Sequence, residues 1–205
     1  MNSHSRVGRP SLSEQRRNEI IGAFVDLVAD RGLEGVTLDD VASRAGVQRA
    51  AIRHFVGNRD KLIAAGMAEL TRRYIVQRDA IAGESPEITP LINSLFSKRW
   101  NLDRWREDAA FDALLLESSR NPTTRETVKA GYDEMLNGIA DALRRSYPDV
   151  PTARIREVAY AIGCIVDQNT TFQHLGYSRT LNTAAKKAAL RIASELGESE
   201  SKSSP

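Results

Sequence analysis

Two arginines, Arg49 and Arg53, stand four residues apart in a stretch that favours a helix. Residues at this spacing share one helix face, so the two guanidinium groups project together. A guanidinium fork matches O6 and N7 of guanine in the major groove, and the amide of Gln48 suits adenine. Ala50 or Ala51 could touch a thymine methyl group. Such a pair on an isolated helix is more often simply solvated, but within a DNA-binding motif it would read base edges.

The net charge of +2 comes entirely from the N-terminal part of the chain. Residues 1–62 contain ten Lys/Arg and eight Asp/Glu, whereas residues 63–205 contain nineteen of each. Within the first segment, basic residues gather on both sides of an acidic middle. A localised basic excess suits a surface that faces a polyanion. Double-stranded DNA is thus the predicted partner.

The reading helix is expected to be the third of four short and medium helices that open the chain. The first, second and fourth helices begin at residues whose side-chain oxygens can cap free backbone N–H groups, whereas Gln48 is expected to cap the third only weakly. A glycine supplies the positive φ of a tight turn between the second and third helices. The predicted helices run from Ser11 to Gly32, Leu38 to Arg44, about Gln48 to Phe55, and Arg59 to about Ile81. The second and third, joined by Ala45-Gly46-Val47, form a helix-turn-helix.

The stretch from Gly35 to Leu62 resembles the DNA-binding domain of the tetracycline-repressor (TetR) family, most clearly in Ala45-Gly-Val-Gln-Arg-Ala-Ala-Ile-Arg-His-Phe-Val-Gly-Asn-Arg-Asp-Lys-Leu62. The resemblance covers about residues 6–65. It implies an all-α fold in which an N-terminal three-helix DNA-binding domain precedes a helical bundle for ligand binding and dimerisation. The DNA-binding domain is expected at residues 1–62, with a basic arm at about 1–10. The helical bundle for ligand binding and dimerisation follows at 63–197, and a disordered tail at 198–205.

The resemblance also suggests contacts with the DNA backbone. Arg59 matches a basic position that contacts phosphate in the family, and it lies in the first turn of a helix, where free N–H groups favour anions. Thr37 occupies a similar place one helix earlier. Arg6 and Arg9 could enter the minor groove from the arm or simply aid solubility. His54 is open to two interpretations, a DNA backbone contact or packing against the first helix.

About five further helices are expected after residue 82. The helix Thr152–Leu175 is apolar on both faces, and the last helix, Leu181–Leu196, has an alanine-rich side that permits close approach. In the family the last two helices generally form the dimer, so the resemblance implies a homodimer. The predicted interface residues are Tyr160, Cys164, Leu181, Ala185, Ala188 and Ile192.

A small-molecule effector is the remaining expected partner. Several large side chains could line its cavity or form ordinary core, and an amide within an apolar face could orient the ligand or satisfy a structural partner. The candidate ligand-binding residues are Phe96, Trp100, Phe111, Met135 and Asn169. Their character predicts a mainly apolar ligand with one or two polar groups, and not a sugar phosphate.

Other classes of function receive less support. The single cysteine, Cys164, predicts a reducing cytoplasmic setting, and no Cys/His cluster indicates a metal or cofactor. The longest uncharged apolar run, Val158–Val166, is too short to span a membrane. A helical enzyme and a protein-interaction module remain the alternatives. The chain lacks HExxH, P-loop and GxSxG sequences, which argues against the enzyme.

Overall fold

The computed structural model describes residues 11–83, 85–102 and 104–201, without the side chains of 101, 102 and 198–201. Throughout these residues the fold is all-α, as predicted, and contains no strand. The helices, in chain order, are α1 Leu12–Arg31, α2 Leu38–Ala45, α3 Arg49–Phe55, α4 Arg59–Ala82, α5 Ile88–Leu95, α6 Lys98–Leu102, α7 Trp105–Ser118, α8 Pro122–Ser146, α9 Thr152–His174 and α10 Arg179–Ser201.

Local signals set the limits of the first four helices. Ser11 and Thr37 each form a capping box, and the Asn58 side chain accepts a hydrogen bond from the Lys61 backbone. Gly46 ends α2 in the left-handed region at φ 64°, where a residue with a Cβ would be strained. Gln48 makes no side-chain cap for α3. The helix-turn-helix therefore forms where the sequence predicted it.

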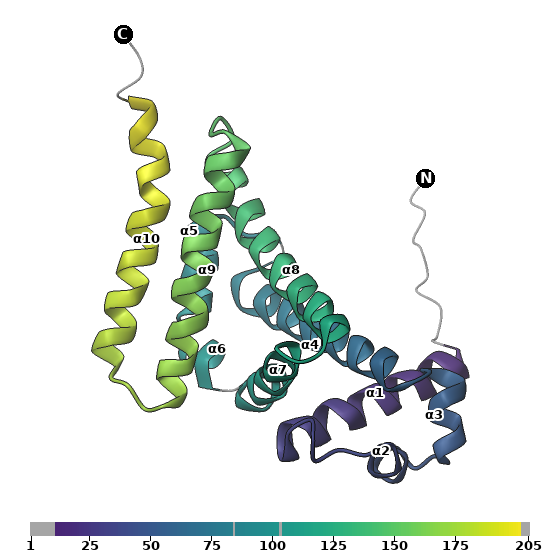
Figure 1. The fold of residues 1–205 in the computed structure, drawn as a ribbon. Helices are drawn as coiled ribbons and strands as arrows, with labels where there is room; N and C mark the ends of the chain where they lie inside the picture. The colour runs from purple at the N-terminus through teal and green to yellow at the C-terminus, as the bar shows by residue number, and fades with distance from the viewer. Residues whose placement is uncertain (1–10, 84, 103, 202–205) are drawn as a thin grey trace, which may run out of the picture.

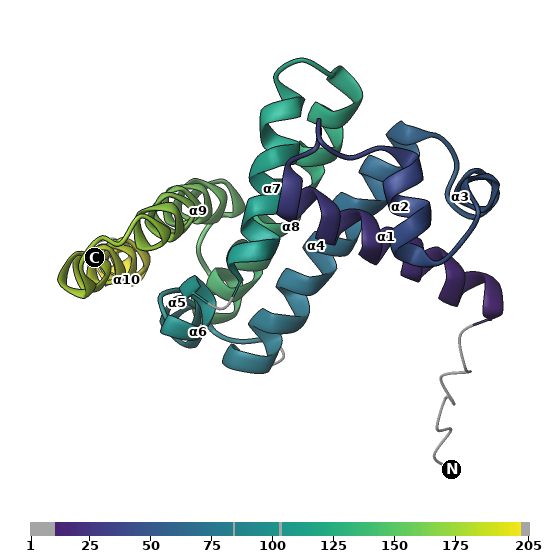
Figure 2. The same ribbon diagram turned by 90° about the horizontal axis from the view of Figure 1, so that it is seen from below.

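A first hydrophobic core joins α1–α4 to the helices α7 and α8. Ile20, Phe24, Ile52 and Leu70 are buried in it together with Leu114 of α7. Figures 1 and 2 show α4 running from the α1–α3 group into the rest of the molecule, while α7 packs across α1. The predicted boundary at residue 62 consequently falls inside α4, a helix shared by both parts.

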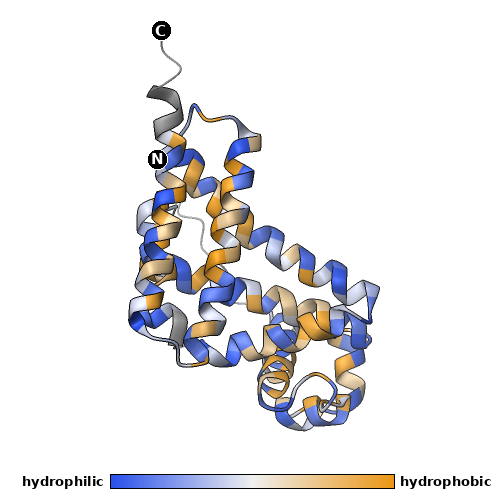
Figure 3. Ribbon diagram, turned by 60° about the vertical axis from the view of Figure 1, so that its left-hand side comes forward, coloured by the Kyte–Doolittle hydropathy of each residue, from blue (hydrophilic) through white to orange (hydrophobic). Residues whose placement is uncertain are grey.

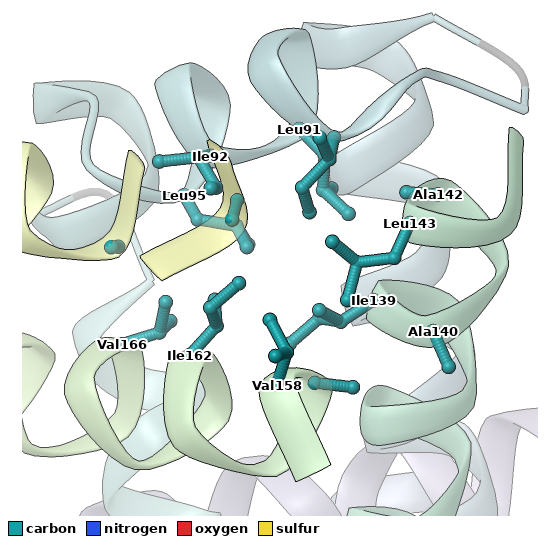
Figure 4. Packing of buried hydrophobic residues seen from close by; sticks show 14 of the residues in the cluster. Leu91, Ile92, Leu95, Ile139, Ala140, Ala142, Leu143, Val158, Ile162 and Val166 are labelled. Atoms are coloured by element: carbon teal, nitrogen blue, oxygen red, sulfur yellow. The ribbon is translucent and has the colours of Figure 1, made fainter. Parts of the chain in front are cut away.

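A second core fills the space between α5, α8, α9 and α10. Figure 4 shows Leu91, Ile92 and Leu95 of α5 pointing toward the buried side chains of α8 and α9. Alanines and Leu196 close it from the α10 side. In Figures 1 and 2 the antiparallel pair α9–α10 lies at the opposite end of the molecule from α1–α3.

Two expectations about the C-terminal part need correction. The described residues after α4 form six helices, not about five, because the short α6 stands between α5 and α7. The predicted tail 198–205 is helical as far as Ser201, since residues 197–201 hold no proline and α10 can propagate through them. The rest of that tail lies outside the described residues.

Candidate nucleic-acid interface and internal pocket

Helix α3 presents a polar surface from a firmly held base. Ile52 is fully buried under it, while Gln48, Arg49, Ala50 and Arg53 are exposed. The two predicted reading arginines therefore face solvent, on a helix short enough to enter a major groove. Ala51 is half-buried, beside a shallow groove between α3 and the start of α1.

Arg49 already has a partner on the neighbouring helix. Its Nη1 lies 2.8 Å from Asp39 Oδ2 of α2, with 63% and 66% of the two side chains exposed. An ion pair this exposed contributes little to stability and is easily exchanged. No ion pair joins Arg53 to any residue that the structure describes. Both guanidinium groups are thus accessible to DNA.

Arg59 makes two hydrogen bonds within the chain that the sequence did not indicate. Its Nη1 donates to the Val36 carbonyl and its Nη2 to the Leu33 carbonyl, each at 3.0 Å. Both carbonyls belong to the loop between α1 and α2. The Arg59 guanidinium therefore fastens this loop to the start of α4, which competes with the expected phosphate contact.

The remaining predicted DNA residues are spread around α3. Thr37 serves as the α2 cap through its hydrogen bonds with Asp40. The exposed ring of His54 packs edge-on against Phe55, with ring centres 4.8 Å apart, and lines the groove beside α1. Arg6 and Arg9 lie outside the described residues.

An internal pocket lies between α4, α5, α6, α7, α8 and α9, with a cavity volume of about 100 Å³. Trp100, Phe111 and Met135, three of the five candidate ligand-binding residues, line it. Phe96 does not, because its ring is buried in the second core.

Asn169 also lies outside this lining, for a physical reason. Its Nδ2 donates to Asn182 Oδ1 at 2.8 Å, and the Asn182 Nδ2 donates to the Phe96 carbonyl at 3.1 Å. This chain of hydrogen bonds links α9, α10 and the end of α5. Of the two roles considered for Asn169, the structural one fits.

Sequence reasoning missed the polar residues at the centre of the pocket. Asp108 Oδ1 accepts hydrogen bonds from Arg104 Nη2 at 2.6 Å and from the Tyr74 hydroxyl at 2.9 Å. Burial, and then the charge of Asp108, raise the pKa of Tyr74, so the phenol stays protonated and donates. The spacing of Arg104 and Asp108 at i and i+4 was the only sequence signal for this group.

Two further carboxyl groups stand at the mouth of the pocket. Burial raises the pKa of Asp112 on α7 and of Asp167 on α9, and the charge of Asp108 acts in the same direction on both. The Tyr132 hydroxyl donates to Asp167 Oδ1 at 3.4 Å, which partly offsets the effect there. Burial and the charge of Asp108 therefore oppose the loss of a proton from both carboxyl groups.

The predicted dimer residues fall into two groups. Tyr160 and Leu181 are 62% and 54% exposed, and Cys164 is exposed as well. Ala188 is half-buried, and Ala185 and Ile192 pack partly against the second core of their own chain. Figure 3 brings the α9–α10 side forward and shows hydrophobic segments along both helices. Phe172 of α9 is also exposed.

Comparisons with known proteins agree with this architecture. A family model described as "Bacterial regulatory proteins, tetR family" matches residues 20–74. The HTH-type transcriptional regulator BetI of Brucella anthropi is 26% identical over 149 residues, which are 72% of this chain and 77% of that protein. A structure from Pseudomonas aeruginosa PAO1 superposes with a TM-score of 0.73 at 16% identity, covering 95% of this chain and 96% of the other.

A TetR transcription regulator from Haloarcula marismortui gives a TM-score of 0.68 at 16% identity, covering 89% and 98% of the two chains. These two structures are similar to this chain in fold.

Across the described residues, no helix is both long and apolar enough to cross a membrane.

Proposed function

We propose that the chain is a DNA-binding transcriptional regulator of the TetR family, and that it acts as a homodimeric repressor released from a palindromic operator by a small ligand. The family model that matches residues 20–74 and the 26% identity to BetI of Brucella anthropi support this assignment. The observation that carries the proposal is the exposed pair Arg49 and Arg53 on a helix anchored by buried Ile52. The proposed setting is the cytoplasm, where such an operator would be reached.

In this proposal residues 1–62 read DNA, and residues 63–197 bind ligand and form the dimer. Two α3 helices related by a two-fold axis would enter major grooves about one helical turn apart, or a multiple of it. The exposed side chains on α9 and α10 support dimerisation there, because a cluster of exposed large apolar groups is typical of an association site.

The pocket supports release by a ligand. Its lining includes residues of α4 and α7, and both helices pack against α1 beneath the reading helix. A ligand that shifts α4 or α7 would change the separation of the two reading helices against half-sites of fixed spacing. The aromatic lining suits a mainly apolar molecule with one or two polar groups.

A gel-shift measurement tests the DNA assignment. DNA fragments retained from the source genome would supply the operator, and Arg49→Ala or Arg53→Ala should each weaken its binding by roughly 1–3 kcal/mol and relax the preference for particular bases. Arg154→Ala is the matched control, because Arg154 on α9 forms a similar exposed pair with Glu157 at 2.9 Å. If all three variants keep the full operator preference, α3 is not the reading helix.

The oligomeric state tests the dimer assignment. Tyr160→Asp combined with Leu181→Asp should give monomers in light scattering and abolish operator binding, because paired carboxylates would have to be buried without partners. Both side chains are exposed in the single chain, so its fold should survive. Leu116→Asp, at an equally exposed leucine of α7, is the control. A double variant that remains dimeric places the interface elsewhere.

A further inference from the structure

The Arg104 guanidinium occupies a box of two aromatic rings. Its central carbon lies 4.2 Å from the ring centre of Tyr74 and 3.9 Å from that of Trp100. Both rings therefore present the negative face that attracts a cation. Arg104 is only 6% exposed, although it lies at the junction between α6 and α7. Arg104 thus occupies a place whose two aromatic rings would suit a bound cation.

The box is completed by Asp108, which is buried with it. One carboxylate oxygen, Oδ1, accepts from Arg104 Nη2 and from the Tyr74 hydroxyl. The other, Oδ2, has no hydrogen-bond partner, and the nearest cationic candidate, His174 Nε2, is 3.5 Å away. A carboxylate between aromatic faces is what an enclosed organic cation requires.

Arg104 itself fits the box imperfectly. Its Nε and Nη1 are buried without a hydrogen-bond partner. Buried donors left unpaired carry a free-energy cost, and a guanidinium has five donors to satisfy. A bound cation with fewer N–H groups would make the same contacts with the two rings and the carboxylate. It would do so without leaving buried donors unpaired.

The charge around the box is also one-sided. The residues that line the pocket include two arginines, Arg78 and Arg104, and four carboxylates, Asp108, Asp112, Glu134 and Asp167. Arg78 pairs with Asp79 at 2.7 Å. The lining therefore attracts an additional cation and repels an anion.

We propose that the box formed by Tyr74, Trp100 and Asp108 binds the charged group of a small organic cation, and that Arg104 is an internal competitor which occupies the box until that cation displaces it. The role of this cation as the effector rests on the function proposed above. Its binding to the box does not.

Displacement of Arg104 would act at a sensitive point. Arg104 directly precedes α7, and two residues later Arg106 Nη2 lies 2.7 Å from Asp30 Oδ1 of α1. Release of the arginine frees the start of α7, the helix that packs against α1. A single helix, α7, thereby connects the box to the reading head, which is the group of helices α1–α3.

Chemical rescue tests the proposal directly. Arg104→Ala empties the box, and ethylguanidinium supplies the missing group. Trp100 fluorescence, recorded in a Trp105→Phe background, reports occupancy. Ethylguanidinium should bind the Arg104→Ala protein at least about tenfold more tightly than the unaltered chain, and neutral ethylurea of similar shape should not bind measurably. Equal binding of ethylguanidinium to both proteins, or equal binding of the cation and the urea, would overturn the proposal.

Three variants make the result specific. Arg78→Ala removes the other lining arginine and should produce no gain, so a gain equal to that of Arg104→Ala would also contradict the box. Adding Asp108→Asn to Arg104→Ala should abolish the rescue. Arg104→Lys keeps a positive charge beside Asp108 and serves if the alanine variant does not fold. This lysine variant should bind ethylguanidinium with an affinity between those of the unaltered chain and Arg104→Ala. An affinity no greater than that of the unaltered chain would count against the proposal.

Operator binding, measured in the same samples, separates the two proposals. Rescue without any operator binding in the unaltered chain refutes the repressor and supports the box. Operator binding without rescue refutes the box and leaves the repressor standing.

Discussion

The reading head and the pocket each contain an arginine–aspartate pair of nearly equal length in opposite surroundings. Arg49 and Asp39 meet at 2.8 Å with 63% and 66% of their side chains exposed. Arg104 and Asp108 meet at 2.6 Å with 7% and 11% exposed. The first pair joins two surface helices. The second lies between aromatic rings inside the molecule.

The difference in exposure decides what each pair can respond to. Water screens an exposed pair, so its net contribution to stability is small and either partner can turn to another charge, such as a DNA phosphate or a guanine edge. Removing one partner of a buried pair is strongly destabilising unless another charge takes its place. The head is therefore suited to exchange with a macromolecule in solution, and the pocket to exchange with an enclosed small cation.

The largest expected effect breaks the buried pair. Asp108→Ala should lower the free energy of unfolding by about 3–5 kcal/mol, because it leaves the Arg104 guanidinium buried without a counter-charge. Asp39→Ala, which breaks the exposed pair, should change it by less than about 0.5 kcal/mol. Urea denaturation of the two variants measures both values. Similar losses would show that burial does not distinguish the two pairs.

The same contrast explains what the sequence could reveal. The head depends on local signals, such as the caps at Ser11 and Thr37 and the turn at Gly46, and each lies within a few residues of the structure it determines. These helices were predicted to within about a residue at most ends. The family resemblance implied the all-α fold, with a helical bundle after the DNA-binding helices.

The pocket depends on contacts that sequence spacing does not encode. Tyr74 and Asp108 are 34 residues apart and meet only because α4 packs beside α7. Arg104 has the composition of a surface residue, and nothing local indicates that two aromatic rings enclose it. Asn169 likewise found its partner, Asn182, on another helix. Aromatic residues were identifiable as pocket candidates, whereas the charged residues among them were not.

An intermediate effect is expected at Arg59, a cation that bonds to the backbone of the head. Arg59→Ala should destabilise the protein by roughly 1–2 kcal/mol, because the carbonyls of Leu33 and Val36 lose a charged donor. Operator affinity should fall for every sequence alike, while the slope of log affinity against log salt stays unchanged.

The salt titration distinguishes this role from a phosphate contact, whose loss would reduce the slope by about one unit. A reduced slope would show that Arg59 contacts a DNA phosphate, and that it does not only hold the loop between α1 and α2. Arg44→Ala is a suitable control, because Arg44 also lies in the helix-turn-helix but pairs with Asp30 at 3.1 Å on the surface.

The smallest effect is expected at the mouth of the pocket, where exposure lies between the two extremes. Burial and the charge of Asp108 raise the pKa of Asp112, so the folded state holds this proton more tightly than the unfolded state does. Its contribution is therefore most favourable in acid and is lost as the pH rises from about 4 through the raised pKa. Asp112→Asn should stabilise the protein at pH 7 by only a few tenths of a kcal/mol, because solvent screens a partly exposed group.

Thermal unfolding between pH 3 and 8 measures this difference, which should vanish at the acid end, where the native carboxyl is protonated too. Asp133→Asn should instead lower the stability at neutral pH. The Asp133 carboxylate pairs with Lys129 on the surface of α8 and is stabilised by the lysine's charge. A destabilised Asp112→Asn at pH 7 would mean that the mouth holds a favourable carboxylate. The repulsion between the mouth and Asp108, which adds to the attraction for a cation, would then be absent.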